Sequence, residues 1–322
     1  MKYFSLSFIL VFFGYCSLFA QSVKVILDTD MDSDVDDVGA LAMLHTFADH
    51  GKVEILGVIV TSDDRYAPGC TDAVNHFFNR PEIPIGVEKG IPLQHISKYT
   101  KEIAEGFPKR LQTYEEAVDA TSLYRRLLAD AADQSVVLIS IGHLTNLAHL
   151  LKSDPDDISP LTGIDLVKQK VKLWSCMGGM YPEGKEANFY RPDPASTVYS
   201  VENWPGEVVF GGWELGNEII TGGLFLQKYL EPTNPVYQAY QLYNNFRGRQ
   251  SWDQASILYA VSPDKDYWEL VREGRCQVHP DGSNSWIFGH RGKQAYLKKK
   301  ADPREVSKII DALMVGSYRP EF

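Results

Sequence analysis

The fold is decided by the stretch Val23-Lys24-Val25-Ile26-Leu27-Asp28-Thr29-Asp30-Met31-Asp32-Ser33-Asp34-Val35-Asp36-Asp37. Residues 23–27 form an apolar run typical of a buried strand, and the apolar spacing of residues 36–50 predicts a helix that ends at Gly51. Six carboxylates therefore lie at one strand–helix junction. They repel one another strongly unless a cation lies among them, and Ca²⁺ is a better candidate than Mg²⁺. An acidic helix cap, the plainer interpretation, needs only one or two carboxylates.

The rest of the chain alternates between strand-like and helix-like patterns. The expected strands cover residues 53–60, 83–87, 135–141, 171–176 and 207–211. The expected helices cover residues 70–79, about 147–151, 193–203 and 113–132, and a capping box at Thr113-Tyr114-Glu115-Glu116 opens the last of them. This alternation predicts an α/β fold, with an open, mostly parallel (Rossmann-like) sheet and helices on both faces.

The C-terminal part and one long loop differ from this pattern. Residues 268–272, 275–279 and 284–290 predict short antiparallel strands, which form a small C-terminal extension before a last helix over about 304–315. The polar loop from about 88 to 112 is typical of a lid or a substrate rim.

The N-terminus has the pattern of a signal peptide over residues 1–20. Lys2 supplies a positive charge, residues 4–19 form an apolar core, and Ala20-Gln21 is the expected cleavage point. An uncleaved membrane anchor is the alternative. Residues 21–322 then form one large α/β domain, which we expect to be exported to the periplasm or secreted, without stable membrane insertion after cleavage.

Charge and cysteine content exclude several functions. The formal net charge of −10 becomes −11 once Lys2 is removed, which argues against nucleic acid as a partner. The three remaining cysteines, Cys70, Cys176 and Cys276, fit neither a disulfide framework nor a zinc site, and we expect them to be buried thiols.

Polar motifs follow the expected strands, where parallel sheets bind their ligands. They are Thr61-Ser62-Asp63-Asp64, Gly142-His143-Leu144-Thr145-Asn146, Met177-Gly178-Gly179-Met180, Glu186-Ala187-Asn188 and, before an apolar helix, Ser251-Trp252-Asp253. Several acidic or glycine-rich loops on one rim predict a single polar pocket.

In these motifs the chain resembles the inosine-uridine-preferring nucleoside hydrolase family, over most of its length after residue 20. The strongest part is Asp-Thr-Asp at 28–30 leading into Asp-Asp at 36–37 and Ala-Leu at 40–41, and the later motifs follow in the family's order. The resemblance implies an open α/β fold with Ca²⁺ at the bottom of the pocket. It also implies hydrolysis of the N-glycosidic bond of small-molecule ribonucleosides, and it leaves open whether the chain forms a homo-oligomer.

The resemblance also implies roles for individual residues. Asp30 matches the general base that takes a proton from a metal-held water and contacts the metal. Asp37, Asp253 and the backbone carbonyl of Ile141 match calcium ligands. The expected substrate-binding residues are Asp36, Asp34, Asp64, Glu186, Asn188 and Trp252.

The chemistry of the reaction agrees with these groups. Breaking a ribosyl C–N bond builds oxocarbenium character on the sugar, which surrounding carboxylates stabilise. Cis-diol oxygens can complete the oxygen shell of Ca²⁺, which would select ribose over 2-deoxyribose.

The chain departs from the family pattern at three places. Two extra residues lie between Asp30 and the Asp36-Asp37 pair, so Asp34 is an alternative for the role of Asp36. Asp64 stands where the family has an Asn. Trp252 stands where many members have a His that is linked to protonating the departing base.

Trp252 decides what the sequence predicts about the leaving group. Its indole can stack on a base but cannot act as a general acid. Activation must then be weak or come from elsewhere, with His143 or His290 the first candidates, and purine ribosides are expected to react faster than uridine. Arg247 and Arg249 lie just before Trp252 and are further candidates for lining the pocket.

Three other interpretations fit the sequence less well. An EF-hand lacks its Gly at Ser33 and its Glu at Gly39. A haloacid-dehalogenase-like phosphatase would need Thr or Val at Asp32. A calcium-dependent riboside- or sugar-binding protein that has lost catalysis remains the main alternative, because Trp252 replaces the acid.

Overall fold

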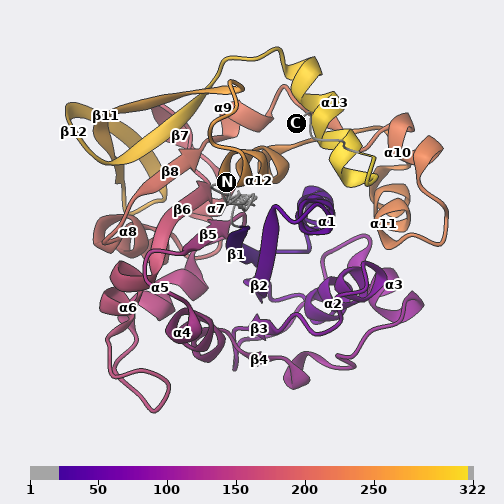
Figure 1. Ribbon diagram of the computed structural model, residues 1–322, viewed down its shortest axis with the longest axis horizontal. Helices are drawn as coiled ribbons and strands as arrows, with labels where there is room; N and C mark the ends of the chain where they lie inside the picture. Colours follow the sequence, from indigo (N-terminus) through magenta and orange to yellow (C-terminus); the bar gives the residue numbers. More distant parts are fainter. Residues whose placement is uncertain (1–21, 318–322) are drawn as a thin grey trace, which may run out of the picture.

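The computed structural model describes residues 22–317, so the predicted signal peptide lies outside the described residues. Ten strands form one sheet in the order β11-β12-β8-β6-β5-β1-β2-β3-β4, and β7 pairs with β12 (Figure 1). The strands are β1 (Val23–Thr29), β2 (Val53–Val60), β3 (Ile85–Val87), β4 (Val118–Asp119), β5 (Val136–Ser140), β6 (Val171–Met177), β7 (Glu183–Lys185), β8 (Val208–Gly211), β11 (Trp268–Val278) and β12 (Ser283–Lys299). A separate antiparallel pair consists of β9 (Ile220–Thr221) and β10 (Arg249–Gln250).

Helices cover both faces of the sheet. On one side lie α1 (Asp36–Asp49), α2 (Ala67–Phe77), α11 (Pro235–Asn244), α12 (Trp252–Val261) and α13 (Pro303–Met314). On the other lie α4 (Ala120–Asp130), α5 (Thr145–Lys152), α6 (Gly163–Lys170) and α8 (Pro194–Asn203) (Figure 1). The shorter helices are α3 (Thr100–Gly106), η1 (Tyr114–Glu116), α7 (Ala187–Tyr190), α9 (Trp213–Gly216) and α10 (Leu224–Tyr229).

Strand β1 explains why the sheet has two apolar faces. Val25 and Leu27 pack into the core under α1, whereas Ile26 packs into the core under α4 and α5. Side chains alternate between the faces of a strand, so a continuous apolar run is what a strand covered on both sides requires. β1 pairs in parallel with β2 on one side and β5 on the other. The predicted open, mostly parallel α/β fold is confirmed.

The capping-box prediction at Thr113 is wrong. Residues 114–116 form a single 3₁₀ turn, and the helix begins at Ala120. The Glu116 carboxylate accepts a hydrogen bond from the backbone N–H of Gln112 at 2.8 Å, one residue before the position that a capping box requires. Asp119 caps the helix instead and accepts from the N–H of Ser122 at 2.8 Å.

The C-terminal prediction was right about antiparallel pairing but wrong about its extent. Two long strands replace three short ones, and the register of β11 against β12 shifts around Gly274. There the backbone has φ +136°, which favours glycine, and a Cβ would lie 2.5 Å from the carbonyl oxygen of Ile287. β12 also pairs in parallel with β8, so the hairpin belongs to the main sheet.

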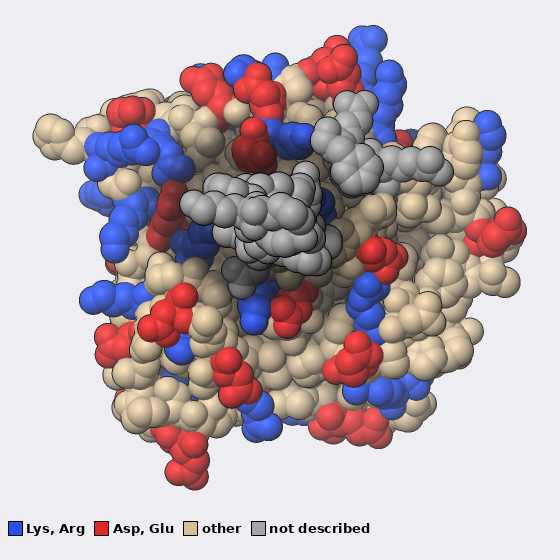
Figure 2. All heavy atoms as spheres, viewed as in Figure 1, with Lys and Arg blue, Asp and Glu red and all other residues tan. Residues whose placement is uncertain are grey.

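Three further observations concern the cysteines, the length of the apolar helices and the charges on the surface. Cys70, Cys176 and Cys276 are buried free thiols. Within residues 22–317, no helix has both the length and the apolar character needed to cross a bilayer. Acidic and basic side chains are interspersed over the face that Figure 2 shows.

The two candidate caps give a direct test. We expect Asp119→Ala to lower the free energy of unfolding by about 1 kcal/mol, because the N–H of Ser122 loses its acceptor. Thr113→Ala is the control, since Thr113 is exposed and caps nothing. Urea unfolding measures both, and equal effects of the two changes would contradict the observed start of α4.

Candidate active site

The acidic junction lies at the carboxyl end of β1, in the middle of the sheet. It forms one side of a cavity of about 800 Å³. The ends of β2, β5 and β6 contribute Thr61, Ile141 and Met177 to the same cavity, and the start of α12 contributes Asp253. The predicted convergence of loops on one rim is therefore what the topology produces.

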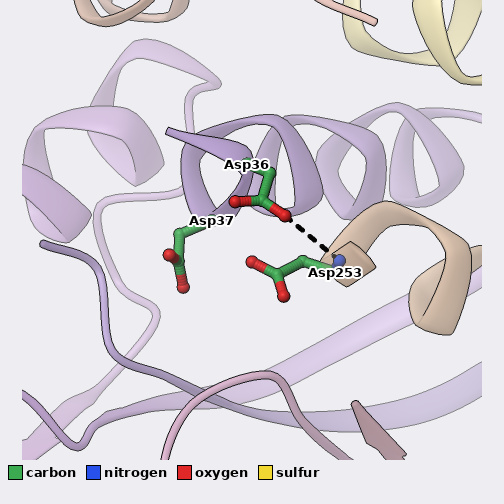
Figure 3. A group of neighbouring side chains, drawn as sticks. All are labelled: Asp36, Asp37 and Asp253. Atoms are coloured by element: carbon green, nitrogen blue, oxygen red, sulfur yellow. Dashed lines mark hydrogen bonds between the residues drawn. The ribbon is translucent and has the colours of Figure 1, made fainter. Parts of the chain in front are cut away.

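Three carboxylates come together at the bottom of this site. Asp36 and Asp37 begin α1, Asp253 lies in the first turn of α12, and all three are at most 4% exposed. One carboxylate oxygen from each lies within 4.8 Å of the others (Figure 3). The backbone N–H of Asp253 donates to Asp36 Oδ2 at 3.3 Å and ties the two helices together. Such a set of buried oxygens fits a hard divalent cation.

The charges in this cluster are not balanced by the chain itself. Within residues 22–317, neither Asp36, Asp37 nor Asp253 forms an ion pair with Lys or Arg. Burial, together with the neighbouring carboxylates, raises the pKa of Asp37 and Asp253 well above the usual range, and burial raises the pKa of Asp36 to about 7. A bound divalent cation would remove this penalty, because it stabilises the ionised carboxylates.

Asp30 lies beside this cluster and lines the cavity. Burial and then the charges of Asp37, Asp32 and Asp36 raise its pKa well above the usual range. Gly142 allows the close approach of the neighbouring loop, since a Cβ there would lie 2.7 Å from the backbone nitrogen of Asp30. A cation bound among these carboxylates would keep Asp30 ionised, and an ionised carboxylate that lines the cavity can accept a proton.

Glu186 and Asn188 line the same cavity; Glu186 directly follows β7, and Asn188 lies in α7. Glu186 caps α7 and accepts hydrogen bonds from the N–H groups of Asn188 at 2.8 Å and Gly179 at 2.9 Å. Burial raises its pKa to about 7. Asn188 Nδ2 donates to the carbonyl oxygen of Ile141 at 3.0 Å. The Ile141 carbonyl, which is predicted to bind the metal, thus contacts the predicted sugar-binding amide of Asn188, and both residues line the cavity.

Trp252 forms part of the cavity wall together with Trp213 and Arg249. Its indole N–H donates to the backbone carbonyl of Trp213 at 2.8 Å. The guanidinium carbon of Arg249 lies 4.9 Å from the centre of the Trp252 ring. Asp34 accepts hydrogen bonds from Arg249 Nη2 and from the Tyr243 hydroxyl, each at 2.6 Å.

The comparisons with known proteins decide the family. The model of the inosine-uridine preferring nucleoside hydrolases matches residues 25–312. The chain belongs to this family. It is therefore an N-glycosyl hydrolase of the nucleoside hydrolase type, and its substrates are small-molecule nucleosides. A search of curated protein sequences gives no match.

Solved structures show the same fold at low identity. The inosine-uridine preferring nucleoside hydrolase of Bacillus anthracis aligns with a TM-score of 0.69 at 16% identity, over 92% of this chain and 99% of that one. A plant nucleoside hydrolase, PpNRh1, gives 0.65 at 16% identity, over 91% and 98%. The type III effector XopQ in complex with adenosine diphosphate ribose gives 0.61 at 13% identity, over 92% and 95%.

The structure of this nucleoside hydrolase brings most of the predicted residues together. The predicted site residues that line the cavity are Asp30, Asp34, Asp36, Asp37, Ile141, Glu186, Asn188, Trp252 and Asp253. Asp36 lies in the carboxylate cluster, whereas Asp34 is held at the rim by Tyr243 and Arg249. The geometry therefore favours Asp36 over Asp34 for the ribose-binding role that is predicted beside the cluster.

Asp64 is not among the residues that line the cavity. It is fully buried, and its carboxylate accepts hydrogen bonds from the N–H of Tyr66 and the hydroxyl of Thr100. Its neighbour Asp63 lines the cavity instead. Asp64 thus anchors the loop after β2, and its predicted place among the substrate-binding residues of the cavity is wrong.

The candidate acids and rim residues also differ in whether they line the cavity. His143 lines the cavity, but burial lowers its pKa to about 4, so it is neutral at pH 7. His290 is exposed on β12, and Arg247 is exposed; neither lines the cavity. Glu88 and Ile96, from the long loop after β3, do line it, as predicted for a substrate rim. Arg191 is a lining residue that no sequence pattern indicated.

The raised pKa values predict how stability depends on pH. In cation-free protein, Asp36 keeps its proton up to about pH 7, whereas in the unfolded chain it ionises near 3.8. The folded state then binds more protons in this window, so its stability should fall as the pH rises from about 4 to 7. Because a cation stabilises the ionised form, the Tm difference between Ca²⁺-loaded and EDTA-treated protein should grow over the same range.

Thermal unfolding at several pH values, with and without EDTA, measures this difference. Asp37→Asn should shrink the stabilisation by Ca²⁺, and Asp157→Asn, an exposed residue between α5 and α6 that does not line the cavity, should not. A Tm difference that stays constant from pH 4 to 7 would contradict the account.

Proposed function

We propose that the enzyme is a Ca²⁺-dependent ribonucleoside hydrolase that prefers purine ribosides, with Asp30 as the general base. The observation that carries the proposal is the cluster of Asp36, Asp37 and Asp253 inside a cavity that Asp30 also lines. Asp37, Asp253, Asp30 and the Ile141 carbonyl would hold the ion. When bound, Ca²⁺ would orient the attacking water and lower its pKa.

The chain's own residues perform the remaining steps. Asp30 accepts the proton that the water loses as its oxygen bonds to C1′ of the ribose. Asp36 accepts a hydrogen bond from the 2′-hydroxyl, and Glu186 and Asn188 hold the other sugar hydroxyls. The surrounding carboxylates stabilise the positive charge that develops on the sugar as the C–N bond breaks.

The main test is an assay of free ribose. Purified protein lacking residues 1–20 is incubated with inosine, adenosine and uridine, in Ca²⁺ and after treatment with EDTA. We expect ribose release that depends on Ca²⁺ and is fastest with a purine riboside. Release that persists unchanged after complete metal removal would contradict the metal dependence.

A second candidate function is calcium-dependent riboside binding without turnover. Trp252 in place of a histidine favours it, and a similar structure, XopQ, was solved with a ribose-containing ligand. Measuring equilibrium binding alongside turnover separates the two functions. Micromolar binding of ribosides without any ribose release would support binding and overturn hydrolysis.

The role of Asp30 can be tested separately. Asp30→Asn should lower kcat on inosine by about 10²–10⁴-fold, because an amide cannot accept the water's proton. Far-UV circular dichroism and the Tm in EDTA, which do not depend on the cation, serve as controls for folding. Near-normal turnover would move the role of base to Asp32, which lines the same cavity and whose pKa burial raises to about 7.

Trp252 gives a test of base recognition. Trp252→Ala should reduce purine turnover by about tenfold, because the base loses its aromatic wall. Ca²⁺ binding should persist, since Trp252 supplies no ligand. Equal rates of the wild type on uridine and inosine would contradict the purine preference.

Export remains a further proposal, resting on residues 1–20 alone. Sequencing the N-terminus of the protein recovered from cells that express the full chain would test it, and Gln21 is the expected first residue. A sedimentation experiment on the same material would give the oligomeric state.

A further inference from the structure

None of the residues assigned so far stabilises the negative charge that develops on the leaving base. When the C1′–N bond breaks, its electron pair goes to the base, which becomes negatively charged unless it is protonated. Trp252 cannot stabilise this charge, because its indole N–H already donates to the Trp213 carbonyl at 2.8 Å. Lys185 also lines the cavity, but its ammonium is paired with Asp281 at 3.1 Å.

Arg249 lies beside Trp252, the aromatic residue against which we expect the base to stack. It precedes Trp252 by three residues, and its backbone is fixed by the pairing of β10 with β9. Its guanidinium carbon lies 4.9 Å from the centre of the Trp252 ring and 5.8 Å from that of Tyr243, and Arg249 lines the cavity with Trp252. A base that stacks in the cavity beside Trp252 would therefore meet the guanidinium.

The guanidinium of Arg249 is held in place by hydrogen bonds, but some of its N–H donors have no acceptor in the described part of the chain. Nη2 donates to Asp34 at 2.6 Å and Nη1 donates to Gln250 Oε1 at 3.3 Å. Nε is buried and has no acceptor among residues 22–317. A guanidinium has five N–H donors, so it can hold Asp34 and still donate to a ligand.

Two departures from the family pattern meet at this residue. The segment between Asp30 and Asp36, which is two residues longer than in the family pattern, includes Asp34, whose carboxylate fixes Arg249. The replaced histidine is Trp252, on which Arg249 stacks. Tyr243 donates to the same carboxylate at 2.6 Å. The insertion and the substitution thus form one structural unit, although 215 residues separate Asp34 from Arg249 in the chain.

We propose that Arg249 contacts the leaving base and stabilises its developing negative charge, and that Asp34 is the residue that positions it. This proposal rests on the proposed hydrolase function. The guanidinium does not release a proton near neutral pH, so it acts by hydrogen bonding and charge. The water oxygen bonds to C1′, its proton goes to Asp30, and the departed base anion takes a proton from solvent, which balances the hydrolysis.

The geometry of a guanidinium also predicts which purines fit. Its planar fork matches two neighbouring acceptors, such as O6 and N7 of a 6-oxopurine. Adenine presents an amino donor in place of O6, so one contact is lost. The preferred substrates are therefore 6-oxopurine ribosides, and inosine should exceed adenosine in kcat/KM by about tenfold or more.

Leaving-group dependence tests the proposal. Arg249→Met keeps the length of the side chain but removes charge and donors, and should lower kcat on inosine by about 10²–10³-fold. On 4-nitrophenyl β-riboside, whose leaving group needs no assistance, the same change should cost less than about threefold by the same reasoning. Arg249→Lys and Asp34→Asn should show the same selectivity to a smaller degree. Arg247→Met, an exposed arginine on the same segment, is the matched control.

Equal losses on both substrates would overturn the proposal, because a purely structural ion pair would slow every reaction alike. Unchanged turnover of inosine by Arg249→Met, or a selective loss of inosine turnover in His143→Gln instead, would also overturn it.

Hypoxanthine binding, followed by tryptophan fluorescence, supplies a readout that does not need turnover. Arg249→Met should weaken it about tenfold or more, and Arg247→Met should not. A wild type that binds hypoxanthine through Arg249 but hydrolyses no riboside would refute the hydrolase function alone.

Discussion

The repulsion among buried carboxylates at the end of β1 is the constraint on which the rest of the site depends. Asp36, Asp37 and Asp253 place oxygen atoms within 4.8 Å of one another in an environment almost without solvent. Burial and neighbouring charges raise the pKa of Asp37 and Asp253 well above the usual range. Folding alone does not favour such an arrangement, and a divalent cation is the simplest group that makes it stable.

The fold explains how these charges are brought together. β1 lies between β5 and β2, so its carboxyl end faces the loops that follow both neighbours. The N-terminus of α1 supplies backbone N–H groups and a positive dipole, which favour acidic side chains there. α12 packs beside α1 and supplies Asp253 from 216 residues further along the chain than Asp37. The rigid sheet thus holds ligands from distant segments in one place.

Much of this could be predicted from the sequence, because the decisive signals are local. The apolar run 23–27 and the acidic residues after it are contiguous, and the order of the later motifs identifies the family. The wrong predictions concern polar side chains that can hydrogen-bond to more than one partner. Glu116 binds the N–H of Gln112 rather than completing a cap, and Asp64 turns inward to Tyr66 and Thr100. The pairing of Asp34 with Arg249 has no local pattern at all, and only the three-dimensional structure shows it.

The central claim is that the acidic junction is a cation site. A crystal structure of the protein grown with Ca²⁺ tests it most directly. We expect one ion in the cavity, bound by carboxylate oxygens of Asp37 and Asp253 and by the Ile141 carbonyl oxygen at roughly 2.3–2.6 Å. A well-ordered cavity in which no ion lies within coordinating distance of Asp37 would contradict the claim.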